Sequence, residues 1–371
     1  METAATLTPT GVAIEDLLDW RPEHGVITVC VEMDPADRSE GWLIDLRKRL
    51  KAAVEVGDDA HDRGRALRAT GQRVLDRFEG EELPSGRLQI GFCEAAERRP
   101  RDIWTSAQLV GFRTAVSYGP RARLTPLLEL LDEGAPVGAV AVSAERVHLH
   151  EWKLGALDLI HDWEAEMYMR DWRERKAQRP ANLARTQGAN ASGRDQFDQR
   201  LEHNRARFLE ETGRLIADES RNRAWSRVIG FGDPDHLREL NEGARKGIEV
   251  ELAEEVNVIS EERGQLLERV NAAVAEGNRH RERALIERAV EATAMPEGRG
   301  ALGVDDVQRS LNEGRVEHLL FDADTENAEL SDLEDEIVER ALRTSARLTP
   351  VEGEAAEILR EHGGVAALLR Y

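Results

Sequence analysis

Apolar positions in the first third of the chain alternate between short continuous runs and helical spacing. Residues 25–31 are rich in β-branched side chains and end at the turn signal Met33-Asp34-Pro35, which favours a buried strand. The predicted strands cover residues 25–31, 88–93 and 107–112, and the predicted helices cover residues 42–54 and 67–78. No Gly-rich phosphate loop follows any of these strands. We therefore expect an α/β domain over residues 1–136 that binds no nucleotide.

The middle third opens with strand patterns and closes with them. Residues 147–152 alternate with period two, as in a half-exposed strand, and Gly155 marks a hairpin turn. The predicted strands cover residues 137–142, 147–152, 157–163, 225–234 and 249–258, with a short helix over 236–240. These patterns define an expected middle domain, residues 137–259.

The last third alternates helices with strands. A long charged helical pattern runs from Ser260 to about Thr293, a helix begins near Gly303, and residues 330–344 form another helix. Strand patterns cover residues 314–322 and 346–348. Such alternation favours a small α/β/α sandwich over residues 260–371. The fold class is therefore α/β (α+β), in three domains.

A polar stretch interrupts the middle domain. Residues 178–193 are mostly small or amide-bearing, with Leu183 as almost the only apolar anchor. Because so little apolar surface cannot offset the entropy of ordering, we expect a mobile loop. From Arg194 onward, apolar residues recur at helical spacing among arginines, which predicts a basic helix. A mobile polar tip on a stiff basic stem is suited to entering a confined, charged place.

The formal charge of −21 argues against a general nucleic-acid binder. Residues 170–209, however, hold 10 Arg/Lys against 5 Asp/Glu. Local charge decides binding to phosphates, so this stretch is a candidate RNA contact. The alternative is an ordinary solvated helix face.

Cysteine usage and the termini indicate an intracellular protein. Cys30 and Cys93 sit in apolar runs without metal-ligand spacing. The chain shows no signal-peptide pattern and no apolar run of the roughly 20 residues needed to cross a bilayer. We expect a soluble, cytoplasmic protein.

Three histidines invite a metal hypothesis. Alternation puts His148 and His150 on one strand face, with His161 on the following strand. No third ligand stands at useful spacing, so we favour exposed strand-face histidines and expect no metal.

The closing segment Gly363–Tyr371, Gly-Gly-Val-Ala-Ala-Leu-Leu-Arg-Tyr, resembles the end of archaeo-eukaryotic class I peptide chain release factors and Pelota almost letter for letter. The middle domain resembles the same family through its paired strands, long loop, and helix with Phe197, Arg200-Leu201 and Phe208. The resemblance covers residues from about 137 to 371 and implies an L30e-like fold for the last domain.

The first domain is too divergent to align. Residues 1–136 contain no stop-codon-reading motif such as Asn-Ile-Lys-Ser. The chain thus looks closer to bacterial members of the superfamily, which resemble the eukaryotic ribosome quality-control peptidyl-tRNA hydrolase.

The family's catalytic Gly-Gly-Gln is absent. Alignment on Phe197 puts the family glutamine near Ser192 or Gly193, so the nearby amides, Gln187 and Asn190, each require a shifted loop. The resemblance makes Gln187, Gly188 and Asn190 the candidate catalytic residues. It also implies that arginines of this region bind RNA phosphates: Arg185, Arg194, Arg200, Arg205 and Arg207.

The resemblance implies a ribosome-associated peptidyl-tRNA hydrolase that rescues stalled ribosomes without a stop codon. The alternative is a non-catalytic, Pelota-like factor that binds ribosomes or splits their subunits. Either implies the ribosome (rRNA) and peptidyl-tRNA as partners, a translational GTPase as a further candidate partner, a monomeric state and no cofactor.

Overall fold

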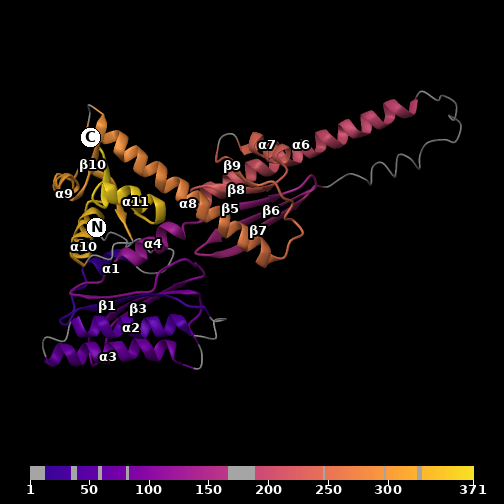
Figure 1. Ribbon diagram of the computed structural model, residues 1–371. Helices are drawn as coiled ribbons and strands as arrows, with labels where there is room; N and C mark the ends of the chain where they lie inside the picture. Colours follow the sequence, from indigo (N-terminus) through magenta and orange to yellow (C-terminus); the bar gives the residue numbers. More distant parts are fainter. Residues whose placement is uncertain are drawn as a thin grey trace, which may run out of the picture. The chain divides into compact units, whose positions relative to one another are not determined.

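The computed structural model describes most of the chain, in two compact units (Figure 1). The described residues are 13–34, 40–56, 61–80, 83–165, 189–244, 247–295, 298–323 and 328–371. Unit 1 joins residues 1–134 to 275–371, and unit 2 is residues 135–274. The mixed α/β class predicted from the sequence is confirmed. The three domain boundaries predicted above remain a proposal.

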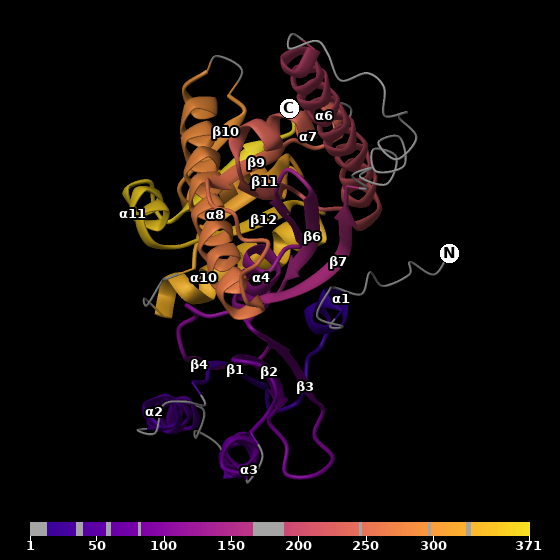
Figure 2. The same ribbon diagram turned by 90° about the vertical axis from the view of Figure 1, so that its right-hand side faces the viewer.

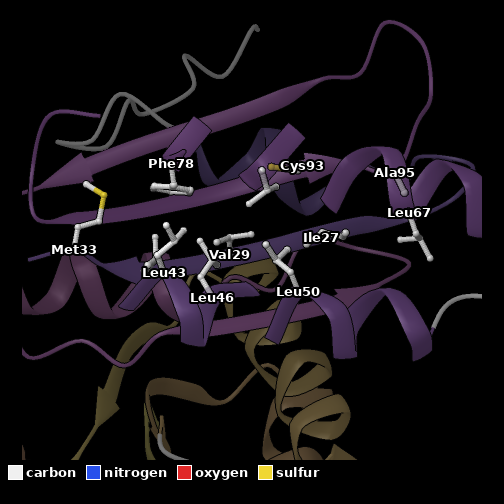
Figure 3. Packing of buried hydrophobic residues seen from close by; sticks show 12 residues of the cluster. Ile27, Val29, Met33, Leu43, Leu46, Leu50, Leu67, Phe78, Cys93 and Ala95 are labelled. Atoms are coloured by element: carbon white, nitrogen blue, oxygen red, sulfur yellow. The ribbon is translucent and has the colours of Figure 1, made fainter. Parts of the chain in front are cut away.

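Unit 1 contains an antiparallel sheet with strand order β3-β2-β1-β4, which we call sheet A. Its elements are α1 (Ile14–Leu18), β1 (Val26–Glu32), α2 (Gly41–Val56), α3 (His61–Phe78), β2 (Leu88–Glu94), β3 (Asp102–Ala107) and β4 (Ala115–Gly119). Figure 2 shows α2 and α3 end-on, together on one side of these strands. Alternate residues of β1, such as Ile27 and Val29, pack against Leu46 and Leu50 of α2 (Figure 3).

The strand predicted over residues 107–112 is wrong, because β3 ends at Ala107. Gly111 has a φ of 98°, which an extended strand does not allow. The N–H groups of Gly111 and Phe112 donate to the carboxylate of Glu32 instead of to a neighbouring strand, at 2.6 and 2.9 Å.

Unit 2 is built on a mixed sheet with strand order β7-β6-β5-β8-β9, which we call sheet B. Its elements are β5 (Val137–Val142), β6 (Arg146–Lys153), β7 (Ala156–Glu164), α6 (Ala189–Arg223), β8 (Val228–Gly232), α7 (Pro234–Ala244) and β9 (Val250–Glu254). β5, β6 and β7 pair antiparallel, whereas β5, β8 and β9 run parallel. Parallel neighbours need crossover helices, and α7 supplies the crossover from β8 to β9.

The remaining sheet of unit 1, sheet C, has strand order β10-β13-β11-β12. Its elements are α8 (Arg263–Ala294) from residue 275 onward, β10 (Gly300–Leu302), α9 (Val304–Asn312), β11 (Val316–Asp322), α10 (Ala328–Arg343), β12 (Arg347–Val351), α11 (Gly353–Glu361) and β13 (Val365–Leu369). Helix α4 (Thr125–Glu133) packs against β12. Leu320 and Ala366 share a core with α8 and α11, while α9 and α10 pack on β13 and β12. The closing segment is thus a central strand of this sheet.

The described helices include none that is both long and apolar enough to cross a membrane.

Candidate functional site

Helix α6 of unit 2 carries the stretch that the sequence singles out. It begins at Ala189, so the last five residues of the loop predicted over 178–193 are helical. The sequence from Ala189 to Ser192 contains no helix breaker, and a lone glycine such as Gly193 costs a helix only about 1 kcal/mol. The stem predicted from Arg194 therefore starts five residues earlier.

The C-terminal half of α6 is anchored in unit 2. Its buried positions follow one helical stripe: Leu209, Thr212, Gly213, Ile216, Ala217 and Ser220. Leu209 and Ile216 enter the core that β5, β6 and α7 share. Between residues 202 and 208, no residue is buried. Figure 1 shows the helix continuing beyond α7, away from sheet B. The structure thus describes a long helix that is held at one end.

Of the three candidate catalytic residues, Asn190 lies at the other end of that helix. Gln187 and Gly188 lie outside the described residues. Asn190 is the second residue of α6. Its side chain lies outside the description, which covers the side chains of α6 only from residue 202 onward. These three assignments stay predictions.

The candidate RNA-binding arginines divide in the same way. Arg185 lies outside the described residues, and Arg194 and Arg200 lie on α6 with side chains outside the description. Arg205 Nη2 lies 3.2 Å from Glu239 Oε1 of α7, and Arg207 Nε donates to Glu211 Oε1 at 2.9 Å. Both described arginines therefore already contact a carboxylate, which phosphate oxygens would have to replace.

Charge along this region is uneven. Helix α6 holds seven arginines and seven carboxylates, whereas residues 170–188 hold six Arg/Lys against two Asp/Glu. The positive excess found in the sequence is thus concentrated before the helix.

A polar network fixes the base of the stem. Trp225 Nε1 donates to Glu151 Oε1 at 2.9 Å, and Arg223 Nε donates to Glu219 Oε2 at 2.8 Å. The hydrogen bond from Arg223 lowers the pKa of the Glu219 carboxyl. His161 Nε2 lies 3.3 Å from the other oxygen of Glu219. Because Arg223 Nη1 also donates to Glu151 Oε2 at 3.4 Å, the end of α6 is tied to β6 and β7 by charged hydrogen bonds as well as by its core.

The structure does not bring the three histidines to one point. The rings of His148 and His150 are 6.1 Å apart, and His148 Nε2 lies 3.3 Å from Asp162. Burial, and next the charge of His148, lower the pKa of His150 to about 4. His161 stacks on Trp163, with ring centroids 4.8 Å apart. The prediction of exposed strand-face histidines is therefore wrong for His150, which is buried in the sheet face.

Unit 1 contains a cluster of three carboxylate side chains that the sequence did not predict. Side-chain oxygens of Asp132, Glu133 and Glu282 all lie within 4.8 Å of one another, close enough to hold a cation. Asp132 and Glu133 lie at the end of α4, whereas Glu282 lies in α8. The three residues therefore form no motif that could be recognised from their spacing in the sequence.

Known families and solved structures resemble parts of this chain. Residues 136–272 match the family model "Bacterial archaeo-eukaryotic release factor family 5". No curated protein shows significant similarity.

Similar solved structures include an archaeal translation termination factor, aRF1, at 16% identity over 96% of each chain, with a TM-score of 0.26. Dom34 of S. cerevisiae, a translation termination-like factor, is 8% identical over 76% of this chain and 80% of its own, with a TM-score of 0.41. A model of ribosome-bound archaeal Pelota and ABCE1 gives 13% identity, 94% and 90% coverage, and a TM-score of 0.44.

Proposed function

We propose that this chain is a member of the archaeo-eukaryotic release factor and Pelota superfamily and that it is a ribosome-associated peptidyl-tRNA hydrolase. It would rescue stalled ribosomes without reading a stop codon. The observation that carries the proposal is that the matched residues, 136–272, contain the whole polar segment and α6. The proposed partners are rRNA and peptidyl-tRNA, and the proposed location of the protein is therefore the cytoplasm.

The proposed chemistry is attack of water on the ester that joins the nascent peptide to the ribose. It needs a donor for the developing oxyanion and a group that orients the water. A small residue such as Gly188 lets the backbone approach the ester closely. The first-turn N–H groups of α6 have no partner within the helix and could donate to the oxyanion. The amide of Gln187 or Asn190 would orient the water.

Positive charge would hold the tip against RNA. The six Arg/Lys of residues 170–188, together with Arg194 and Arg200, are the proposed phosphate contacts. Arg205 and Arg207 would join them by exchanging their carboxylate partners for phosphate oxygens. Ribosome binding should then weaken as salt rises.

The absence of Gly-Gly-Gln favours a second candidate function. A Pelota-like factor that binds ribosomes or splits their subunits needs the same stem but no hydrolytic amide. A translational GTPase partner and a monomeric state are compatible with both functions.

The deciding measurement is single-turnover release of labelled peptide from stalled ribosome–nascent-chain complexes. Wild type is compared with Gln187→Ala and Asn190→Ala, while co-sedimentation reports ribosome binding. We expect one of the two substitutions to slow release about 100-fold or more, with binding retained.

Asn204→Ala is the matched control, since Asn204 is an exposed amide of the same helix, 14 residues from Asn190. It should release peptide at the wild-type rate. Binding without release by any variant would establish the non-catalytic alternative, and absence of binding by wild type would refute both.

A further inference from the structure

Helices α6 and α7 cross at two glycines. An ideal Cβ on Gly213 of α6 would lie 3.0 Å from the carbonyl carbon of Leu240 and closer still to its oxygen. A Cβ on Gly243 of α7 would lie 2.6 Å from the carbonyl carbon of Glu210, again closer to the oxygen. Ordinary contacts of a Cβ lie at 3.4–4 Å. Each helix therefore occupies the space of a side chain that the other lacks.

The atoms that a Cβ would meet belong to backbone. A flexible side chain could rotate away, but the carbonyl groups of Leu240 and Glu210 are fixed by their helices. Relief requires the two helices to separate. The pair is also tied on its flank by the 3.2 Å contact of Arg205 with Glu239. The crossing thus fixes the distance and direction of α6 within unit 2.

The length of α6 enlarges any change at this crossing. Gly213 lies 24 residues from Ala189 and 10 residues from Arg223. At 1.5 Å per residue these distances are about 36 Å and about 15 Å. If the C-terminal end of α6 stays fixed, a displacement of Gly213 by about 1 Å away from α7 moves the start of α6 by about 3 Å.

We propose that Gly213 and Gly243 are positioning residues, whose crossing directs the first turn of α6, which carries Asn190, to its place of action. The consequence for peptide release rests on the proposed function, whereas the crossing itself does not. A misplacement of about 1 Å can cost about 100-fold in rate. A single methyl group about 36 Å from the tip should therefore slow release strongly.

The geometric test is a distance within unit 2. Spin labels are placed at Asn204 of α6 and Leu159 of β7, both exposed, in a chain whose own cysteines are buried. We expect Gly213→Ala and Gly243→Ala each to shift this distance by about 2 Å, because position 204 lies nearer the crossing than the tip. An unchanged distance in both variants would overturn the proposal.

Gly264→Ala is the matched control. Gly264 lies in α8, within unit 2, and an added Cβ would meet nothing within 4 Å. The label distance and peptide release should both match wild type. If Gly213→Ala and Gly243→Ala fail to fold, Gly247→Ala takes their place. Its added Cβ would lie 2.5 Å from the Cβ of Ala217 in α6, and we expect a smaller shift of the label distance.

The functional test uses the same variants. Gly213→Ala should slow single-turnover peptide release about 100-fold while ribosome co-sedimentation persists, a combination that loss of folding would not give. Release at the wild-type rate, with the helix displaced, would refute the positioning role. If wild type releases no peptide, the proposed hydrolase fails, while the label distance still decides whether the glycines direct α6.

Discussion

The two long helices α6 and α8 each pack against a shorter helix, and these two contacts differ in kind. At Gly213, α6 meets its neighbour backbone to backbone, with no side chain between. Where α8 passes the end of α4, residues 278–282 meet it through charged and amide side chains. Steric contact does not change with pH, whereas contacts between ionisable groups do. The same task of holding a helix therefore gives two regions with different responses to solution conditions.

The contact of α8 with α4 concentrates negative charge. Asn278 Nδ2 donates to Glu133 Oε2 at 2.8 Å, Arg281 pairs with Asp132, and Glu282 is only 4% exposed. Burial, followed by the charge of Glu133, raises the pKa of Glu282 to about 8. Burial also raises the pKa of Asp132 to about 6, against the effect of Arg281. At neutral pH this contact should hold a proton on Glu282.

The largest expected effect is the response of this contact to pH. Because the folded pKa of Glu282 lies above its unfolded value, the folded state binds the extra proton, and stability falls as pH rises from about 4.5 to about 8. The slope is about 1.4 kcal/mol per pH unit and lessens near pH 8, which gives a loss of about 2 kcal/mol between pH 6 and 8. Glu282→Gln, a neutral mimic of the acid, should remove most of it.

Hydrogen exchange of α4 and of residues 275–290 measures this slope locally. Glu276→Gln is the control, because Glu276 lies on the same helix with an exposed side chain. It should keep the wild-type slope. A slope that survives in Glu282→Gln would assign the pH response to another group.

The sequence predicts elements that depend on local preferences better than contacts between distant residues. The β-branched run at residues 25–31 predicts β1 almost to the residue, since burial and strand preference act locally there. Helix α11 escapes prediction because two of its three buried residues are alanines, which give a weak apolar pattern. The contact of Glu282 with Asp132 joins residues far apart in the chain, and only tertiary packing creates it.

The candidate site divides along the same line. The stem, α6, follows from helical periodicity, although its start at Ala189 does not. A lone glycine inside a helical pattern, such as Gly213, signals close packing but not its partner. Glu239, the partner of Arg205, carries no signal in the sequence at all. Gln187 and Gly188 stay predictions that rest on the family resemblance.

A smaller effect should come from the glycine crossing. Gly243→Ala should lower the opening free energy of α6 and α7 by about 1–3 kcal/mol, the usual cost of overpacking. Because the clash is with the backbone of Glu210, the loss should be equal at pH 6 and pH 8. Hydrogen exchange at both pH values measures it, with Gly264→Ala as control. A loss that varies with pH would contradict the steric account of this crossing.

The smallest effect is expected from surface charge on α6. Arg207 and Glu211 form an i,i+4 pair with side chains 72% and 53% exposed, and such pairs contribute at most about 0.5 kcal/mol. Glu211→Gln should therefore leave the exchange of α6 within about 0.5 kcal/mol of wild type. If Arg207 binds RNA, losing this competing carboxylate should also make ribosome co-sedimentation more resistant to salt. A loss of more than about 1 kcal/mol would show that surface charge holds α6, which would remove the contrast with α8.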